Sequence, residues 1–138
     1  MDRQLISART PWGDLFGYSR AVRIGNVVKV GGTIATDKEG NVHGKDDIYR
    51  QAVYIIRKIE SALEEAGASL GDVVRTRMFV TDINNYEGLA RAHAEFFGEI
   101  HPASTMVEIS RLMSEDFLLE MEAEAIIETD AHSIKDSA

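Results

Sequence analysis

Apolar and acidic residues alternate near the end of the chain. The apolar positions are Leu119, Met121, Ala123, Ala125 and Ile127, and the acidic positions are Glu120, Glu122, Glu124 and Glu128. A period of two is typical of a β-strand with one apolar and one charged face. The acidic face either meets solvent, where charged residues mostly lie, or looks into a cleft that holds counter-charges or a ligand. In such a cleft a carboxylate with a raised pKa can act as a general acid or base.

The first third of the chain predicts short strands joined by turns. Residues 3–7 alternate weakly, which predicts an edge strand, and residues 10–14 predict a turn or loop. Residues 21–24 and 27–30 are β-prone runs, and the intervening Gly25-Asn26 favours a hairpin because both residues tolerate positive φ.

Two further features follow the predicted hairpin. Gly31-Gly32 either forms a β-bulge or lets another backbone or a ligand approach closely. Residues 37–41 predict a turn that lacks the ligand spacing of a calcium loop.

Two segments have helical periodicity. Residues 46–66 place apolar side chains every three or four positions and are followed by Gly67, a typical C-terminal cap. The second helix is expected to begin with Asn84 or Asn85 as its cap, with Glu87 completing a capping box if the cap is Asn84, and to end at Gly98. Its predicted inward side chains are Leu89, Ala92, Phe96 and Phe97.

Between the helices, residues 72–81 predict a strand with two different faces. Val74, Met78 and Val80 are expected on one face, and Arg75, Arg77 and Phe79 on the other. Arginines on such a strand indicate a half-buried sheet face with acidic partners.

The predicted order is β-ββ-α-β-α-ββ, which defines a single α+β domain over residues 1–128 with two helices packed on one face of a sheet. The other face is left uncovered within one chain, and because it carries both apolar and charged side chains, we expect self-association to bury it. Residues 129–138 are polar enough to predict a frayed tail.

Composition excludes several functions. The 138 residues include no cysteine, so thiol nucleophiles, disulfides and thiolate metal sites are ruled out. The net charge of -8 opposes non-specific binding to nucleic acid, although a local basic patch stays possible. No apolar run is long enough to span a membrane, and no signal peptide is evident, so we expect a cytoplasmic protein. The histidines lack metal-ligand spacing, and His93 is expected at the surface or the edge of the core.

Four segments together resemble one family. They are FGYSRAVRIGN, VGGTIATDKEGNV, GDVVRTRMFVTDINNYEGL, and HPASTMVEISRL with LLEMEAEA. The chain is similar, from about residue 5 to 127, to the RidA/YjgF family, also called the reactive intermediate deaminase or L-PSP endoribonuclease family. The resemblance implies a chorismate-mutase-like fold with a mixed sheet, a homotrimer, and small-molecule sites in clefts between subunits. Deaminase-type members hydrolyse 2-imino or 2-enamino acids without metal or organic cofactor.

The resemblance also implies roles for individual residues. Glu120 matches the acidic residue that positions the attacking water, Tyr18 the tyrosine that closes the pocket, and Gly32 the glycine whose backbone faces the ligand. Phe79 and Met106 are then wall residues.

The chain departs from the family at one position. Deaminase-type members carry an arginine after the proline-alanine pair, and this arginine binds the substrate carboxylate; here Ser104 follows Pro102-Ala103. One neutral hydrogen bond from a serine hydroxyl replaces the paired, charged hydrogen bonds of a guanidinium group, which weakens carboxylate binding by about 1 to 3 kcal/mol. Arg77 and Arg20 are candidate replacements, with the alternatives that Arg77 pairs with carboxylates of the last strand and that Arg20 lies at the surface or an interface.

Three functions follow from the resemblance. The favoured one is a RidA-like hydrolytic deaminase of an imine or enamine other than the usual short 2-imino acids. The second is a trimer that binds a small metabolite or has a regulatory role without catalysis. The third, a ribonuclease or translation inhibitor, is opposed by the acidic composition and by the lack of a histidine pair.

Overall fold

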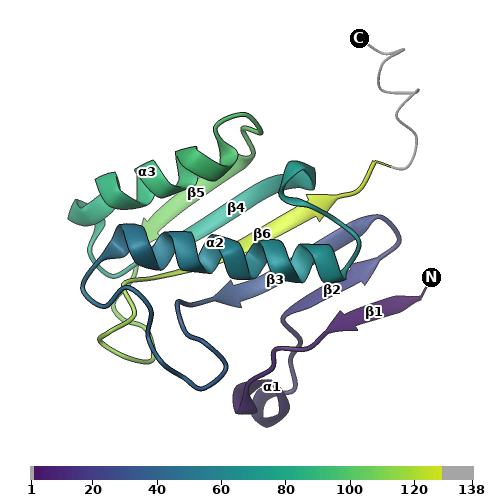
Figure 1. The fold of residues 1–138 in the computed structure, drawn as a ribbon, viewed down its shortest axis with the longest axis horizontal. Helices are drawn as coiled ribbons and strands as arrows, with labels where there is room; N and C mark the ends of the chain where they lie inside the picture. The colour runs from purple at the N-terminus through teal and green to yellow at the C-terminus, as the bar shows by residue number, and fades with distance from the viewer. Residues whose placement is uncertain (1, 129–138) are drawn as a thin grey trace.

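One six-stranded mixed sheet organises the computed structural model, which describes residues 2–128 (Figure 1). The strand order across the sheet is β1-β2-β3-β6-β4-β5. The strands are β1 (Arg3–Ile6), β2 (Ala21–Ile24), β3 (Val27–Thr33), β4 (Val73–Val80), β5 (Ala103–Glu108) and β6 (Leu119–Ile126). Only β4 and β5 pair in parallel; the other pairs are antiparallel. The last strand in sequence therefore lies in the middle of the sheet.

Two long helices, α2 (Ile48–Glu65) and α3 (Tyr86–Phe97), cover one face of this sheet (Figure 1). Ile55, Ile56, Ile59 and Leu63 lie on one side of α2 and are fully buried. Burying each such side chain contributes roughly 1.5–3 kcal/mol, so the amphipathic stripe of α2 fixes the helix on the sheet. Beneath it, the apolar face of β6 is buried at Leu119, Met121, Ala123 and Ala125.

The N-terminal strand predictions are confirmed. β1 is an edge strand, and β2 and β3 form an antiparallel hairpin through Gly25, whose φ is 61°. The β3–β6 register shifts between Val30 and Thr33, so Gly31-Gly32 lies in a β-bulge. The predicted turn at residues 37–41 is present, with the Gly40 N–H donating to the Asp37 carbonyl.

The prediction for residues 10–14 was wrong, because helix α1 (Pro11–Phe16) lies there. Pro11 is in the first turn, where its fixed φ suits a helix and its missing N–H costs nothing. Gly17 ends this short helix in the left-handed conformation, with φ of 75°.

Two details of the later elements also differed. Val74 was expected on the apolar face of β4, but it is 42% exposed because the β4–β6 register shifts between Val73 and Arg75, and Val73 is buried instead. Of the two predicted caps of α3, Asn85 is confirmed, so the capping box that depended on Asn84 as the cap is absent. Residues 83–85 form a 3₁₀ turn capped by Asp82, and the cap position of α3 is Asn85, whose side chain makes no capping hydrogen bond.

The second face of the sheet carries no helix among the described residues, as expected (Figure 1). Leu5, Ile24, Val107 and Ile126 are exposed, and the strand registers place them on the same face as the glutamates of β6. The predicted tail, residues 129–138, lies outside the described residues. No helix within residues 2–128 combines the length and apolar character that a membrane crossing requires.

Gln51 connects helix α2 to the loop that leads into β6. Its fully buried side chain accepts from the Leu118 N–H at 3.0 Å and donates to the carbonyls of Asp116 and Gly44 at 2.8 and 3.2 Å. The backbone groups just before β6 are therefore held by one side chain.

We predict that Gln51→Met lowers the free energy of unfolding by about 2–4 kcal/mol, because an apolar side chain of similar length leaves three partly buried backbone groups without their hydrogen-bond partner. Urea unfolding measures this. The control Arg50→Met, at an exposed position of the same helix, is expected to change stability by about 0.5 kcal/mol or less. Equal stability of Gln51→Met and the control would contradict the assigned role.

Candidate functional site

The carboxylate of Glu120 lies directly against the backbone of Gly32. A Cβ added at Gly32 would be 2.8 Å from both the Cδ and Oε2 atoms of Glu120. Any side chain at this position would therefore displace the carboxylate. The β-bulge of β3 and the central position of β6 bring these two residues together. Both alternatives predicted for Gly31-Gly32 thus apply: the pair forms a bulge, and the missing side chain of Gly32 lets the Glu120 carboxylate approach the backbone closely.

Burial raises the pKa of the Glu120 carboxyl above its usual value, the negative charge of Glu122 raises it further, and Arg20 opposes the shift. Glu120 is half-buried, and no side-chain hydrogen bond to its carboxylate is present among the described residues. A carboxyl with these properties holds a proton more readily than an exposed glutamate and can exchange it with a bound molecule.

Arg20 lies behind this pair and is only 9% exposed. Its Nη1 donates to the Gly32 carbonyl and to the Thr33 hydroxyl. The guanidinium carbon is 5.8 Å from the centre of the Tyr18 ring, which is exposed. The alternative that Arg20 is a surface residue was therefore wrong. The reason is that Arg20, just before β2, donates a hydrogen bond to the Gly32 carbonyl in the bulge of the neighbouring strand. This contact depends on how β2 and β3 pair, which the local sequence does not show.

Phe79 and Arg77 lie on the same sheet face as Glu120. In the β4–β6 register Phe79 is opposite Glu120 and Arg77 is opposite Glu122. Arg77 Nε is 3.0 Å from Glu122 Oε1, and its Nη2 is 3.9 Å from Glu124 Oε1. Arg77 thus pairs with carboxylates of the last strand, which was the alternative to its binding a ligand, whereas Phe79 lies opposite Glu120.

Ser104 and Met106 lie on the opposite face of the sheet from Glu120. β5 pairs with β4 so that Ser104 is beside Thr76 and Met106 beside Met78, and these β4 residues alternate with Arg77 and Phe79. One chain therefore brings Glu120, Gly32, Arg20, Tyr18 and Phe79 together, but separates Ser104 and Met106 from them.

A cavity of about 520 Å³ lies where α3 meets β5. Its lining includes Met78, Leu89, His93, Phe97, Ser104 and Met106. The Ser104 hydroxyl is 2.6 Å from the Thr76 hydroxyl, which is 2.8 Å from His93 Nε2. Burial lowers the pKa of His93, which favours the neutral imidazole. A neutral chain of two hydroxyls and an imidazole thus ends at Ser104, the residue that follows Pro102-Ala103.

Sequence reasoning missed Thr76 and the connection to His93. His93 was expected at the surface or core edge, and it is half-buried. The pairing of β4 with β5 brings the three polar side chains together, and no local pattern shows that pairing before the fold is known. Among the described residues, no group of three or more histidine, aspartate or glutamate side chains is arranged to hold a metal ion.

Fold and site together define a small α+β domain in which one acidic side chain is held against a glycine backbone on an open sheet face. A family model described as endoribonuclease L-PSP matches residues 13–127. A RutC family protein of Pyrococcus abyssi is 43% identical over 106 residues, covering 77% of this chain and 83% of the relative. The chain belongs to the L-PSP endoribonuclease family, also called RidA/YjgF.

Solved structures support the same assignment. A Mycobacterium tuberculosis member of the YjgF/YER057c/UK114 family has a TM-score of 0.83 and 42% identity, covering 91% of this chain and all of the other. E. coli TdcF with bound serine has a TM-score of 0.73 and 28% identity, covering 80% of this chain and 88% of the other. The family resemblance and the predicted fold class are confirmed.

We predict that Glu122→Gln lowers the pKa of Glu120, because the variant removes a nearby negative charge that disfavours ionisation of Glu120. A ¹³C NMR titration of the glutamate carboxyl groups measures the shift. Glu128→Gln, a substitution of an exposed glutamate after the end of the strand, serves as the control and is expected to leave the pKa of Glu120 unchanged. An unchanged or higher pKa in Glu122→Gln would refute the charge coupling.

Proposed function

We propose that this protein is a RidA-like hydrolytic deaminase that acts on a small imine or enamine. The observation that carries the proposal is the half-buried Glu120 carboxylate, which has a raised pKa and lies against the bare backbone of Gly32. The carboxylate can orient a water molecule, while the glycine leaves room for a ligand beside it. A protonated imine carbon is already electrophilic, so a positioned water and one proton-transfer group supply the essential chemistry.

The reaction proceeds by addition and elimination. The ionised Glu120 accepts a proton as the water oxygen bonds to the imine carbon, and the C=N π electrons move to nitrogen. The resulting carbinolamine receives that proton on nitrogen, the C–N bond breaks as the C=O bond forms, and the hydroxyl proton passes to the departing ammonia. For each protonated imine, one water is consumed and one ammonium released, and Glu120 returns to its ionised starting state.

We further propose a cytoplasmic homotrimer with its sites between subunits. Two features support it: the open sheet face carries exposed apolar side chains, and Ser104 and Met106 point away from Glu120 within one chain. Packing the open face of one copy against the β5 edge of another would bring the two halves of a site together and bury the apolar side chains.

The substrate is expected to lack a carboxylate at the Ser104 end of the site. Ser104 is linked to neutral groups, and Arg77 already neutralises Glu122. These contacts favour an uncharged hydrogen-bonding group over an anion at this position. E. coli TdcF, crystallised with bound serine, supports small-metabolite binding by this fold.

A second candidate function is metabolite binding without turnover. The observation that favours it is the neutral Ser104–Thr76–His93 chain, which can hold a polar ligand without any charged group to fix it for reaction. Turnover measurements separate the two functions.

We predict that Glu120→Gln reduces ammonia release from small imines by at least about a hundredfold, the usual scale of losing a proton-transfer group. Freshly generated imines and enamines, with and without a carboxylate, are the substrates. Glu124→Gln, on the same face of the same strand, is the matched control and is expected to stay near wild type.

Light scattering should give a mass of three chains for all three proteins. Intact trimers without any turnover would favour the binding function, and monomers or dimers would refute the proposed assembly.

We also predict that Ser104→Arg increases kcat/KM for carboxylate-bearing imines by about ten- to a hundredfold, since a charged fork replaces one neutral hydrogen bond. Activity on carboxylate-free imines should stay level or fall. Ser104→Gln, which is long but uncharged, is the control and should not produce the gain. If Ser104→Arg has no preference for carboxylates, position 104 does not face the substrate.

A further inference from the structure

Another cavity, which shares Arg20 with the proposed active site, lies between the loop after β1, helix α2 and residues 36–39. Its volume is about 370 Å³. Its lining includes Thr10, Arg20, Thr36, Tyr54, Lys58 and Ser61. Neither Glu120 nor Ser104 belongs to the lining, so the proposed deaminase chemistry does not account for it.

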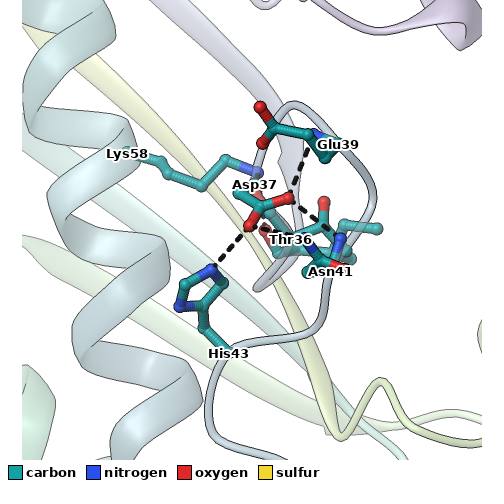
Figure 2. Close-up of polar contacts among 7 residues, drawn as sticks. Thr36, Asp37, Glu39, Asn41, His43 and Lys58 are labelled. Atoms are coloured by element: carbon teal, nitrogen blue, oxygen red, sulfur yellow. Dashed lines mark hydrogen bonds and ion pairs between the residues drawn. The ribbon is translucent and has the colours of Figure 1, made fainter.

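The cavity is locally basic, although the whole chain has a net charge of -8. Arg9, Arg20, Lys38 and Lys58 line it, against the two acidic residues Asp37 and Glu39. Arg9 is paired with Glu65 outside the lining, which leaves three cations. Asp37 is already engaged: it accepts from the backbone N–H groups of Glu39 and Asn41 and lies 3.0 Å from His43 Nε2 (Figure 2). The hydrogen bond with His43, followed by that from the Asn41 N–H, holds the pKa of Asp37 far below its usual value.

Lys58 reaches from α2 toward the turn that contains Asp37 (Figure 2). Its ammonium donates to the carbonyls of Ile34 and Thr36, each at 2.8 Å. An ammonium has three N–H groups, so one donor remains beyond these two bonds. Burial, with a smaller contribution from the charge of Arg20, lowers the pKa of Lys58 to about 8, and the charge of Asp37 opposes this shift. Two cations that disfavour one another thus line the same cavity, and a bound anion would relieve their repulsion.

Thr10 adds an independent observation. The residue lines the cavity, and its hydroxyl oxygen is buried and has no hydrogen-bond partner among residues 2–128. Buried polar groups almost always have partners, because an unpaired one costs about 1–3 kcal/mol. An oxygen of a ligand in the cavity would accept from this hydroxyl.

We propose that this cavity binds a small oxyanion, the carboxylate or phosphate group of a metabolite, through Lys58, Arg20 and the Thr10 hydroxyl. Arg20 also donates to the Gly32 carbonyl beside Glu120, and substituting it would disturb the proposed active site as well. Lys58 and Thr10 are therefore the residues to test, and binding is measured without reference to any catalytic activity.

The experiment titrates the wild-type protein separately with inorganic phosphate and with acetate. Calorimetry gives affinities, and ¹H–¹⁵N NMR locates the site. We expect saturable binding of at least one anion, with shifts at the amides of Thr10, Thr36 and Lys58, and the preferred anion identifies the ligand group. Lys58→Gln should weaken binding about tenfold or more, because it removes a charged hydrogen bond. Lys29→Gln, on the open sheet face and outside the cavity, is the matched control and should bind like wild type.

Thr10→Val keeps the test valid if Lys58→Gln fails to fold. This near-isosteric change should weaken anion binding severalfold and leave the anion-free protein as stable as wild type or more so, because the unpaired buried hydroxyl is gone. Loss of stability without loss of affinity would overturn the proposal. So would the absence of binding at 10 mM-scale concentrations of either anion, or equal weakening by Lys29→Gln, since general charge attraction would then explain the result.

Discussion

The alternation along β6 is the constraint on which the rest of the structure depends. Its apolar side chains are buried beneath α2, so its glutamates must lie on the open face. A shift of one residue in the pairing of β6 would bury its three glutamates and expose its apolar side chains. The hydrophobic core thus fixes the position of Glu120, although Glu120 takes no part in that core. The bulge in β3 then places Gly32 where the carboxylate needs space.

The glutamates on the open face differ in whether they have a cationic partner. Glu122 and Glu124 lie near Arg77, and Glu124 also pairs with Lys29 at 3.3 Å. Glu120 has no such close partner in the described part of the chain, and burial raises the pKa of its carboxyl. Because the folded state favours the protonated form, this group contributes stability below its unfolded pKa and loses that contribution as pH rises through the folded pKa. Ionised Glu120 therefore costs stability at neutral pH, as is common for residues kept for function.

Much of the fold could be predicted from the sequence, because most of its elements have strong local signals. The period of β6, the stripe of α2 and the Gly25-Asn26 turn each identify an element without tertiary information. Helix α1 was missed because a proline and a glycine within a few residues indicate a turn as well as a short helix. Val74 was misplaced because a bulge shifts the register, and nothing in the run of valines marks where it occurs.

The candidate site was less predictable, since its parts come from different strands. The family resemblance suggested Glu120, Gly32 and Tyr18, but only the register shows that Ser104 and Met106 lie on the other face. Likewise, the burial of Arg20 and the link from Ser104 through Thr76 to His93 depend on contacts between residues distant in sequence. Local patterns predict elements, whereas these contacts depend on how the elements pair.

The most direct test of the central claim is the pH dependence of kcat/KM for imine hydrolysis, compared with the NMR titration of Glu120. If the ionised carboxylate activates water, kcat/KM falls as pH decreases through a pKa above that of an ordinary glutamate, and this value matches the titration of Glu120. A rate that does not follow the ionisation of Glu120 would contradict the account, because another group or the substrate alone would then control the proton transfer.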